Sequence, residues 1–191
     1  MTLPYQLPIQ IAICGLPGTG TTTIAKLLSE TTGHDMKSGG SIMRDAAQKR
    51  NMSISEFAEF CKTHPSIDRE LDKTQQNMSA TPNLILESRL AWLNLPDSFK
   101  ILITCRHDVR ITRLSVRENK TFEIEYEQDK VRVAADKERY YHLYNYVDYL
   151  APEHFNLVVD STDHSPEDIV RVILTAFEQN NNQVALSLAT N

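Results

Sequence analysis

The chain has 191 residues, of which 41% are hydrophobic, and this size suits one domain with a substantial core. Its formal net charge of −5 argues against a general nucleic-acid binder, since such proteins need basic surfaces for the phosphate backbone. No apolar run is long enough to span a membrane, and we expect neither a leader segment nor a membrane partner. Cys14, Cys61 and Cys105 lack metal-ligand spacing. We expect Cys14 and Cys105 to be buried free thiols in a cytoplasmic protein.

Five short apolar runs predict β-strands, and helical patterns alternate with them. The runs at 83–87, 100–105 and 156–160 are apolar nearly throughout, as expected for strands that are covered on both faces. Alternating strands and helices predict a doubly wound α/β fold around a parallel sheet with right-handed crossovers. The predicted strands, in chain order, are 9–14, 34–37, 83–87, 100–105 and 156–160.

Directly after the first predicted strand, residues 15–23 read Gly-Leu-Pro-Gly-Thr-Gly-Thr-Thr-Thr. This is the frame of a phosphate-binding P-loop, in which a lysine and then a Ser or Thr follow the last glycine. Thr21 stands where the lysine belongs, while Thr22 has the hydroxyl position that ligates Mg²⁺. A simple turn between a strand and a capped helix is the alternative. The residues predicted to bind ATP are Gly15, Pro17, Gly18, Thr19, Gly20, Thr21, Thr22 and Thr23, with Thr22 as the metal ligand.

Residues 38–80 contain helical patterns without a clear strand, which predicts a helical insertion between two strands of the sheet. Residues 119–131 are polar and follow a basic helix, and we expect them to form a short, mobile lid. Residues 179–191 are expected to form a loosely ordered polar tail. The core of this single domain of residues 1–191 would consist of 9–37, 81–118 and 132–178.

Arginines at helical spacing are candidate cations for bound phosphates. Two sets would each share one helix face: Arg106, Arg110, Arg113 and Arg117, and then Arg132, Asp136 and Arg139. A solvated basic stripe and a ladder of surface ion pairs are the alternatives. We expect Arg113 and Arg117, which lie nearest the predicted lid, to replace the missing lysine, because guanidinium groups bind phosphate bidentately.

Several motifs resemble the nucleoside monophosphate kinases, and within them the archaeal-type cytidylate kinases. Residues 64–72, His-Pro-Ser-Ile-Asp-Arg-Glu-Leu-Asp, are close to the family's His-Pro-Glu-Ile-Asp-Arg-Glu-Ile-Asp. Residues 87–92 are similar to its Glu-Gly-Arg-Leu-Ala-Gly-Trp, with Ser88 in place of the first glycine. The similar segments, spread in order between residues 9 and 178, are 15–23, 38–44, 51–57, 64–72, 87–92, 132–140 and 159–162.

The resemblance implies a P-loop nucleoside monophosphate kinase fold with a helical acceptor-binding insertion and a short lid. It implies ATP and Mg²⁺ as cofactors, CMP or dCMP as the acceptor, and no side-chain base. Archaeal-type members often carry Gly-Thr-Thr-Thr at the P-loop, so Thr21 is consistent with them. By resemblance, the catalytic residues are Arg113, Arg117, Arg132 and Arg139, and the acceptor site comprises Gly40, Arg44, Arg89, Arg132, Asp136 and Arg139.

Two carboxylate sites keep alternatives open. Glu87 ends a central predicted strand and is expected either to touch Mg²⁺ through water or to pair with Arg89. Asp68 and Asp72, in the insertion, favour capping and surface pairing, and contact of Asp68 with the amino group of cytosine is the alternative for that residue.

We therefore expect a monomeric, ATP-dependent cytidylate kinase. One alternative is a kinase of another nucleotide or a small metabolite on the same scaffold. The other is a nucleotide-binding sensor or pseudokinase, in which Thr21 and Ser88 mark lost catalysis. The retained arginines of the acceptor site argue against the sensor, because a protein that only senses ATP needs no acceptor clamp.

Overall fold

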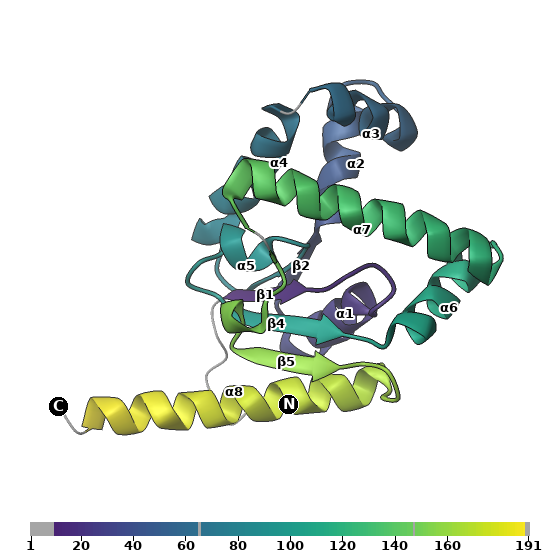
Figure 1. The fold of residues 1–191 in the computed structure, drawn as a ribbon. Helices are drawn as coiled ribbons and strands as arrows, with labels where there is room; N and C mark the ends of the chain where they lie inside the picture. Colours follow the sequence, from purple (N-terminus) through teal and green to yellow (C-terminus); the bar gives the residue numbers. More distant parts are fainter. Residues whose placement is uncertain (1–9, 65, 147, 190–191) are drawn as a thin grey trace.

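A computed structural model describes residues 10–64, 66–146 and 148–189 of the chain (Figure 1). Five parallel strands form one sheet in the order β2-β3-β1-β4-β5, as the sequence predicts for a doubly wound α/β fold. Each end of each strand lies within one residue of the predicted run. The strands are β1 (Gln10–Cys14), β2 (Asp35–Ser38), β3 (Leu84–Glu87), β4 (Phe99–Thr104) and β5 (Leu157–Asp160).

Helices cover both faces of the sheet. Ile11 and Ile13 of β1 pack against α1 and α8 on one face, whereas Ala12 and Cys14 face α5 and its Trp92 on the other. Every residue of β1 is buried, which is why residues 11–14 are apolar without alternation. The helices are α1 (Thr21–Thr32), α2 (Gly39–Lys49), α3 (Ile54–Thr63), α4 (Ser66–Gln76), α5 (Ala91–Asn94), α6 (His107–Glu118), α7 (Phe122–Tyr144) and α8 (Pro166–Ala189), with 3₁₀ turns η1 (Asn77–Ala80) and η2 (Pro152–His154).

The segment predicted as a helical insertion forms α2, α3, α4 and η1, between β2 and β3. It has a small apolar cluster of its own around Ala47, Phe57 and Ile67. Ser38 starts α2 directly at the end of β2 through a capping box with Ser41, whose backbone N–H donates to Ser38 Oγ at 3.0 Å. This cap fixes the start of α2 above the end of the sheet.

The segments predicted as a lid and as a tail are both helical over most of their length. The predicted lid is helical from Phe122, and α7 runs without a break to Tyr144, crossing over the sheet in Figure 1. Its polar residues include the buried Glu125 and Asp129, which form ion pairs with Arg132 and Arg110. The predicted tail is helical as far as Ala189, at the end of α8. Movement of either segment stays a prediction.

Cys14 is buried as predicted, but Cys105 is only half-buried, because β4 ends at Thr104 and leaves Cys105 beyond the sheet. Among the helices of the described residues, none is both long and apolar enough to cross a bilayer.

Candidate active site

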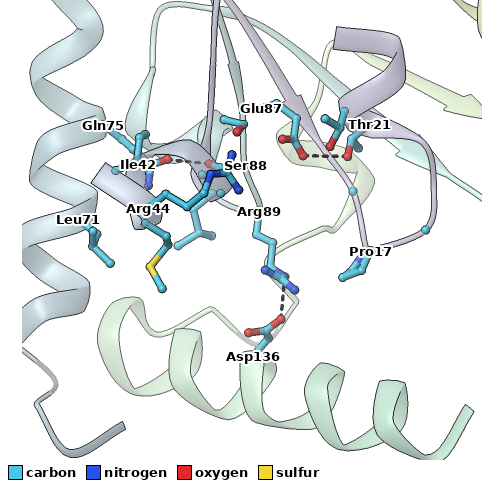
Figure 2. Close-up of a pocket in the computed structure, with 18 of the residues that line it drawn as sticks. Pro17, Thr21, Ile42, Arg44, Leu71, Gln75, Glu87, Ser88, Arg89 and Asp136 are labelled. Carbon is cyan, nitrogen blue, oxygen red and sulfur yellow. Dashed lines mark hydrogen bonds and ion pairs between the residues drawn. The ribbon is translucent and has the colours of Figure 1, made fainter. Parts of the chain in front are cut away.

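A cavity of about 790 Å³ lies at the carboxyl ends of β1, β2 and β3 (Figure 2). Its walls come from the loop after β1, the start of α2, one face of α4, the end of β3, and α6 and α7. Ligands of parallel α/β sheets bind at this edge, beyond the carboxyl ends of the strands. Segments far apart in the sequence therefore meet at one site.

The loop after β1 leaves no space for side chains at two of its glycines. A Cβ on Gly15 would lie 2.6 Å from the carbonyl oxygen of Ile103, and one on Gly18 would lie 2.7 Å from that of Arg110. Gly18 also has φ +86°, which favours glycine. No side chain caps the start of α1 at Gly20, so the N–H groups of its first turn are free to bind an anion. The cradle fits the phosphates of a nucleotide.

Thr21 occupies the position of the P-loop lysine, where it forms a hydrogen bond and brings no positive charge. Its Oγ1 donates to Glu87 Oε1 at 2.8 Å (Figure 2). Burial raises the pKa of the Glu87 carboxyl, although hydrogen bonds from Thr21 and Thr22 and the nearby charge of Arg89 oppose that shift. The hydroxyl of Thr22 and the carboxylate of Glu87 are hard oxygen ligands beside the phosphate cradle, and this donor set fits Mg²⁺.

The four arginines predicted on one face of α6 have different environments. Arg106 is exposed and pairs with Asp108. Arg110 is buried and donates from Nη1 to the carbonyl oxygen of Pro17 at 2.9 Å and to Asp129 Oδ1 at 2.8 Å. Arg110 therefore links the phosphate loop to α7. Of these four arginines, Arg113 and Arg117 line the cavity.

Arg113 and Arg117 both line the cavity, but their side chains have different hydrogen-bond partners. Arg113 donates from Nη2 to the carbonyl oxygen of Ser161 at 2.7 Å, and Ser161 Oγ donates to the carbonyl oxygen of Thr19 at 2.7 Å. Arg117 is exposed, and its Nε donates to Glu118 Oε1 at 2.9 Å. Arg113 is thus held against the phosphate loop through Ser161, whereas the exposed Arg117 pairs with its neighbour Glu118.

Arginines of the predicted acceptor site line the other half of the cavity. Arg89 Nε lies 2.7 Å from Asp136 Oδ2, so Arg89 pairs with α7 and not with Glu87 (Figure 2). Arg139 lies between Asp68 Oδ1, at 3.3 Å, and Asp136 Oδ1, at 3.4 Å. Burial would lower the pKa of Arg139, but Tyr140 and these two carboxylates outweigh it and raise the pKa.

The structure brings most of the predicted site residues to this cavity. Arg44 lies beside Gly40, where a Cβ would be 3.5 Å from Arg44 Nη1. Thr19 is buried behind the loop, where its Oγ1 donates to the carbonyl oxygen of Leu16 at 2.8 Å. Arg132 is not among the lining residues, because its Nη2 donates to Glu125 Oε1 on its own helix at 2.5 Å. From α7, the residues that line the cavity are Asp136, Arg139 and Tyr140.

The sequence did not lead us to predict that one face of α4 forms a wall of the site. Asp68, Leu71, Asp72 and Gln75 all line the cavity. Their i, i+3, i+4, i+7 spacing is the pattern of one helix face, and this spacing was the available signal. Asp68 and Asp72 are thus cavity residues, and instead of pairing on the surface they contact Arg139 and Tyr144 of α7.

Comparisons with known proteins agree with the fold and show the family. A family model described as an AAA domain matches residues 11–134. A protein named cytidylate kinase from Methanobrevibacter smithii is 37% identical over 169 residues, which are 88% of this chain and 98% of that protein. Another of that name from Archaeoglobus fulgidus is 33% identical over 172 residues, 89% of this chain and 95% of its own.

Solved structures with low sequence identity share the fold. Shikimate kinase from Acinetobacter baumannii, in complex with shikimate, aligns with a TM-score of 0.63 at 15% identity, over 92% of this chain and 95% of that one. Shikimate kinase from Aquifex aeolicus aligns with a TM-score of 0.56 at 18% identity, over 90% and 97%. On the sequence matches, this chain belongs to the cytidylate kinase family and to the family that the AAA-domain model describes.

Proposed function

We propose that the protein is a cytidylate kinase that transfers the γ-phosphoryl group of ATP to CMP or dCMP. The observation that carries the proposal is a single cavity with a phosphate cradle in one half and Arg44, Arg89 and Arg139 in the other. Two phosphate-binding regions in one cavity are what a reaction between two nucleotides requires. The printed names of the relatives support cytidine monophosphate as the acceptor.

Phosphoryl transfer requires positioning and neutralisation of charge more than covalent chemistry by the protein. The N–H groups at the start of α1 hold the donor phosphates, and the uncapped helix end favours their negative charge. Thr22 and Glu87 would hold Mg²⁺, which when bound neutralises charge on the transferred and leaving phosphates. Arg113 and Arg117 supply positive charge that the lysine position lacks.

Arg44, Arg89 and Arg139 bind the acceptor phosphate and orient its oxygen toward the donor. In this proposal, α2, α3 and α4 act as an acceptor-binding insertion that helps to exclude water, so that the phosphoryl group goes to the nucleotide and not to hydrolysis. The segment 119–131 acts as a lid. Arg132, which pairs with Glu125, would join the reaction only after a rearrangement of α7.

We also propose that the enzyme is a cytoplasmic monomer whose partners are small nucleotides, without nucleic acid or membrane. The net charge of −5 supports the absence of nucleic acid, because the phosphate backbone is attracted to basic surfaces.

The test is ADP release by the purified protein with ATP and Mg²⁺ across CMP, dCMP, UMP, AMP, GMP and a sample without acceptor. Turnover that is confined to the cytidine monophosphates is expected, with the diphosphate product identified by chromatography. Arg44→Ala should raise the KM for CMP, whereas Arg171→Ala, on the exposed face of α8, is the matched control and should not. ATP binding without turnover on any acceptor would indicate a nucleotide sensor, and turnover on another acceptor alone would refute the cytidylate assignment.

A further inference from the structure

The cavity wall formed by α4 carries groups that the phosphates do not need. Asp72 and Gln75 both line the cavity and are three positions apart on α4, which is about 4.5 Å along the helix axis at a rise of 1.5 Å per residue. This separation is comparable to the length of the hydrogen-bonding edge of a pyrimidine ring. Asp72 offers carboxylate acceptors, and Gln75 offers an amide with two N–H donors. One turn of α4 therefore presents an acceptor and a donor side by side to the acceptor half of the cavity.

A hydrogen bond from Ser88 orients the amide of Gln75. Ser88 Oγ donates to Gln75 Oε1 at 2.7 Å, across the gap between the end of β3 and α4 (Figure 2). Gln75 is only 7% exposed, yet it lines the cavity. No residue in the described part of the chain accepts a hydrogen bond from Gln75 Nε2. With its oxygen held by Ser88, Gln75 keeps both N–H groups for a ligand.

The carboxylate of Asp72 is also held in place. Asn94 Nδ2 donates to Asp72 Oδ1 at 3.3 Å, and the hydroxyl of Tyr144 donates to Asp72 Oδ2. A carboxylate has about four acceptor sites, so these two bonds restrain its orientation and leave capacity for a ligand. Fixed polar groups that face a cavity lose little conformational freedom on binding, and this favours selective recognition.

We propose that Asp72 and Gln75 read the base of the acceptor, with Ser88 as the positioning residue for Gln75. The Asp72 carboxylate accepts a hydrogen bond from the exocyclic amino group of cytosine, and the Gln75 amide donates to its ring nitrogen and its carbonyl oxygen. Uracil presents a carbonyl to the carboxylate and a ring N–H to the amide, so it is mismatched at both groups. Adenine has the amino group and the ring nitrogen but no carbonyl oxygen to accept the second N–H of Gln75. The inference rests on the proposed kinase function and extends it to the choice of acceptor.

The test compares kcat/KM for CMP with kcat/KM for UMP. The wild-type ratio should exceed about 100, because a site with fixed hydrogen-bonding groups rejects a ligand that leaves them unpaired. Gln75→Glu keeps the shape and the bond from Ser88 but exchanges the donor for an acceptor, and should reduce the ratio roughly 10- to 100-fold. The combined change Asp72→Asn and Gln75→Glu inverts both groups and should favour UMP. Gln48→Glu is the matched control, an exposed glutamine on α2, and should leave the ratio unchanged.

The role of Ser88 has its own readout. Ser88→Ala should reduce the CMP:UMP ratio, mainly through the KM for CMP, and Ser88→Thr, which keeps a hydroxyl, should restore it. ATP binding by calorimetry should be the same in all these variants, because the phosphate cradle is elsewhere in the cavity, and it verifies that each variant is folded. If Gln75→Glu does not fold, the CMP:UMP ratio of Ser88→Ala alone tests the proposal.

The outcomes separate the two proposals. If the wild-type protein does not phosphorylate CMP, the proposed function is wrong. If CMP is phosphorylated and the CMP:UMP ratio is the same in wild type, Gln75→Glu and Ser88→Ala, the kinase function holds and the reading of the base by α4 is overturned.

Discussion

Neutralising Asp129 should destabilise the protein strongly, because it would leave the Arg110 guanidinium buried without its counter-charge. The two side chains are 4% and 1% exposed, and both terminal nitrogens of Arg110 donate to the carboxylate. Removing one partner of such a pair costs about 3–5 kcal/mol of the free energy of unfolding. For a domain of this size, each kcal/mol corresponds to roughly 2–4 °C, so Asp129→Asn should lower Tm by roughly 6–20 °C.

Thermal unfolding by calorimetry at constant pH and salt measures the effect. The matched control is Asp168→Asn, which breaks an exposed pair with Arg171, where the side chains are 47% and 74% exposed. An exposed pair contributes at most about 1 kcal/mol, so Tm should change by only a few degrees. The double change of Arg110→Met and Asp129→Leu should recover much of the stability, since it removes both buried charges.

The same pair links stability to nucleotide binding. Arg110 Nη1 also donates to the carbonyl oxygen of Pro17 in the phosphate loop, so a displaced guanidinium should raise the KM for ATP more than the KM for CMP. A Tm loss for Asp129→Asn no larger than that for Asp168→Asn would refute the reasoning, because the charge of Arg110 would then be satisfied by another route.

Further predictions concern the lysine position, the α6 arginines and a thiol. Thr21→Lys should lower kcat, because the ammonium group would pair with Glu87, which Thr21 contacts at 2.8 Å; a variant faster than wild type in steady-state kinetics contradicts this. Arg113→Ala and Arg117→Ala should each lower kcat on the order of 100-fold and change the KM for CMP little, and unchanged kcat in both would exclude them as the compensating cations. Burial raises the pKa of the Cys14 thiol to about 12, so iodoacetamide at pH 8 should label Cys14 only after unfolding, as mass spectrometry can test.

The strands and the phosphate loop could be predicted from the sequence because their signals are local. A strand covered on both faces needs an uninterrupted apolar run, and β1, β3 and β4 contain such runs at 11–14, 84–86 and 101–103. The loop at 15–22 needs glycines at set positions because neighbouring atoms leave no space there, as at Gly18. The family motifs likewise lie within short segments, and they indicated Arg44, Arg89 and Arg139, which line the cavity.

The partner of each charged side chain was decided only by the tertiary structure. Arg110 and Arg113 are one turn apart on α6, yet Arg110 holds Pro17 and Asp129, whereas Arg113 holds Ser161 at the cavity wall. Nothing in their spacing separates these roles, because the partners come from segments far away in the chain.

The same reason explains the predicted lid and the α4 wall. The sequence determined that 119–131 is polar and that α4 is amphipathic. Only the fold decided that buried carboxylates of the first segment pair with arginines of α6 and α7, so that the segment is helical. Only the fold brought Gln75 within 2.7 Å of Ser88. The hydrophobic effect acts between an apolar side chain and water and needs no particular partner, so its pattern can be read along the sequence. An ion pair or a hydrogen bond needs one particular partner, which only the folded chain brings near.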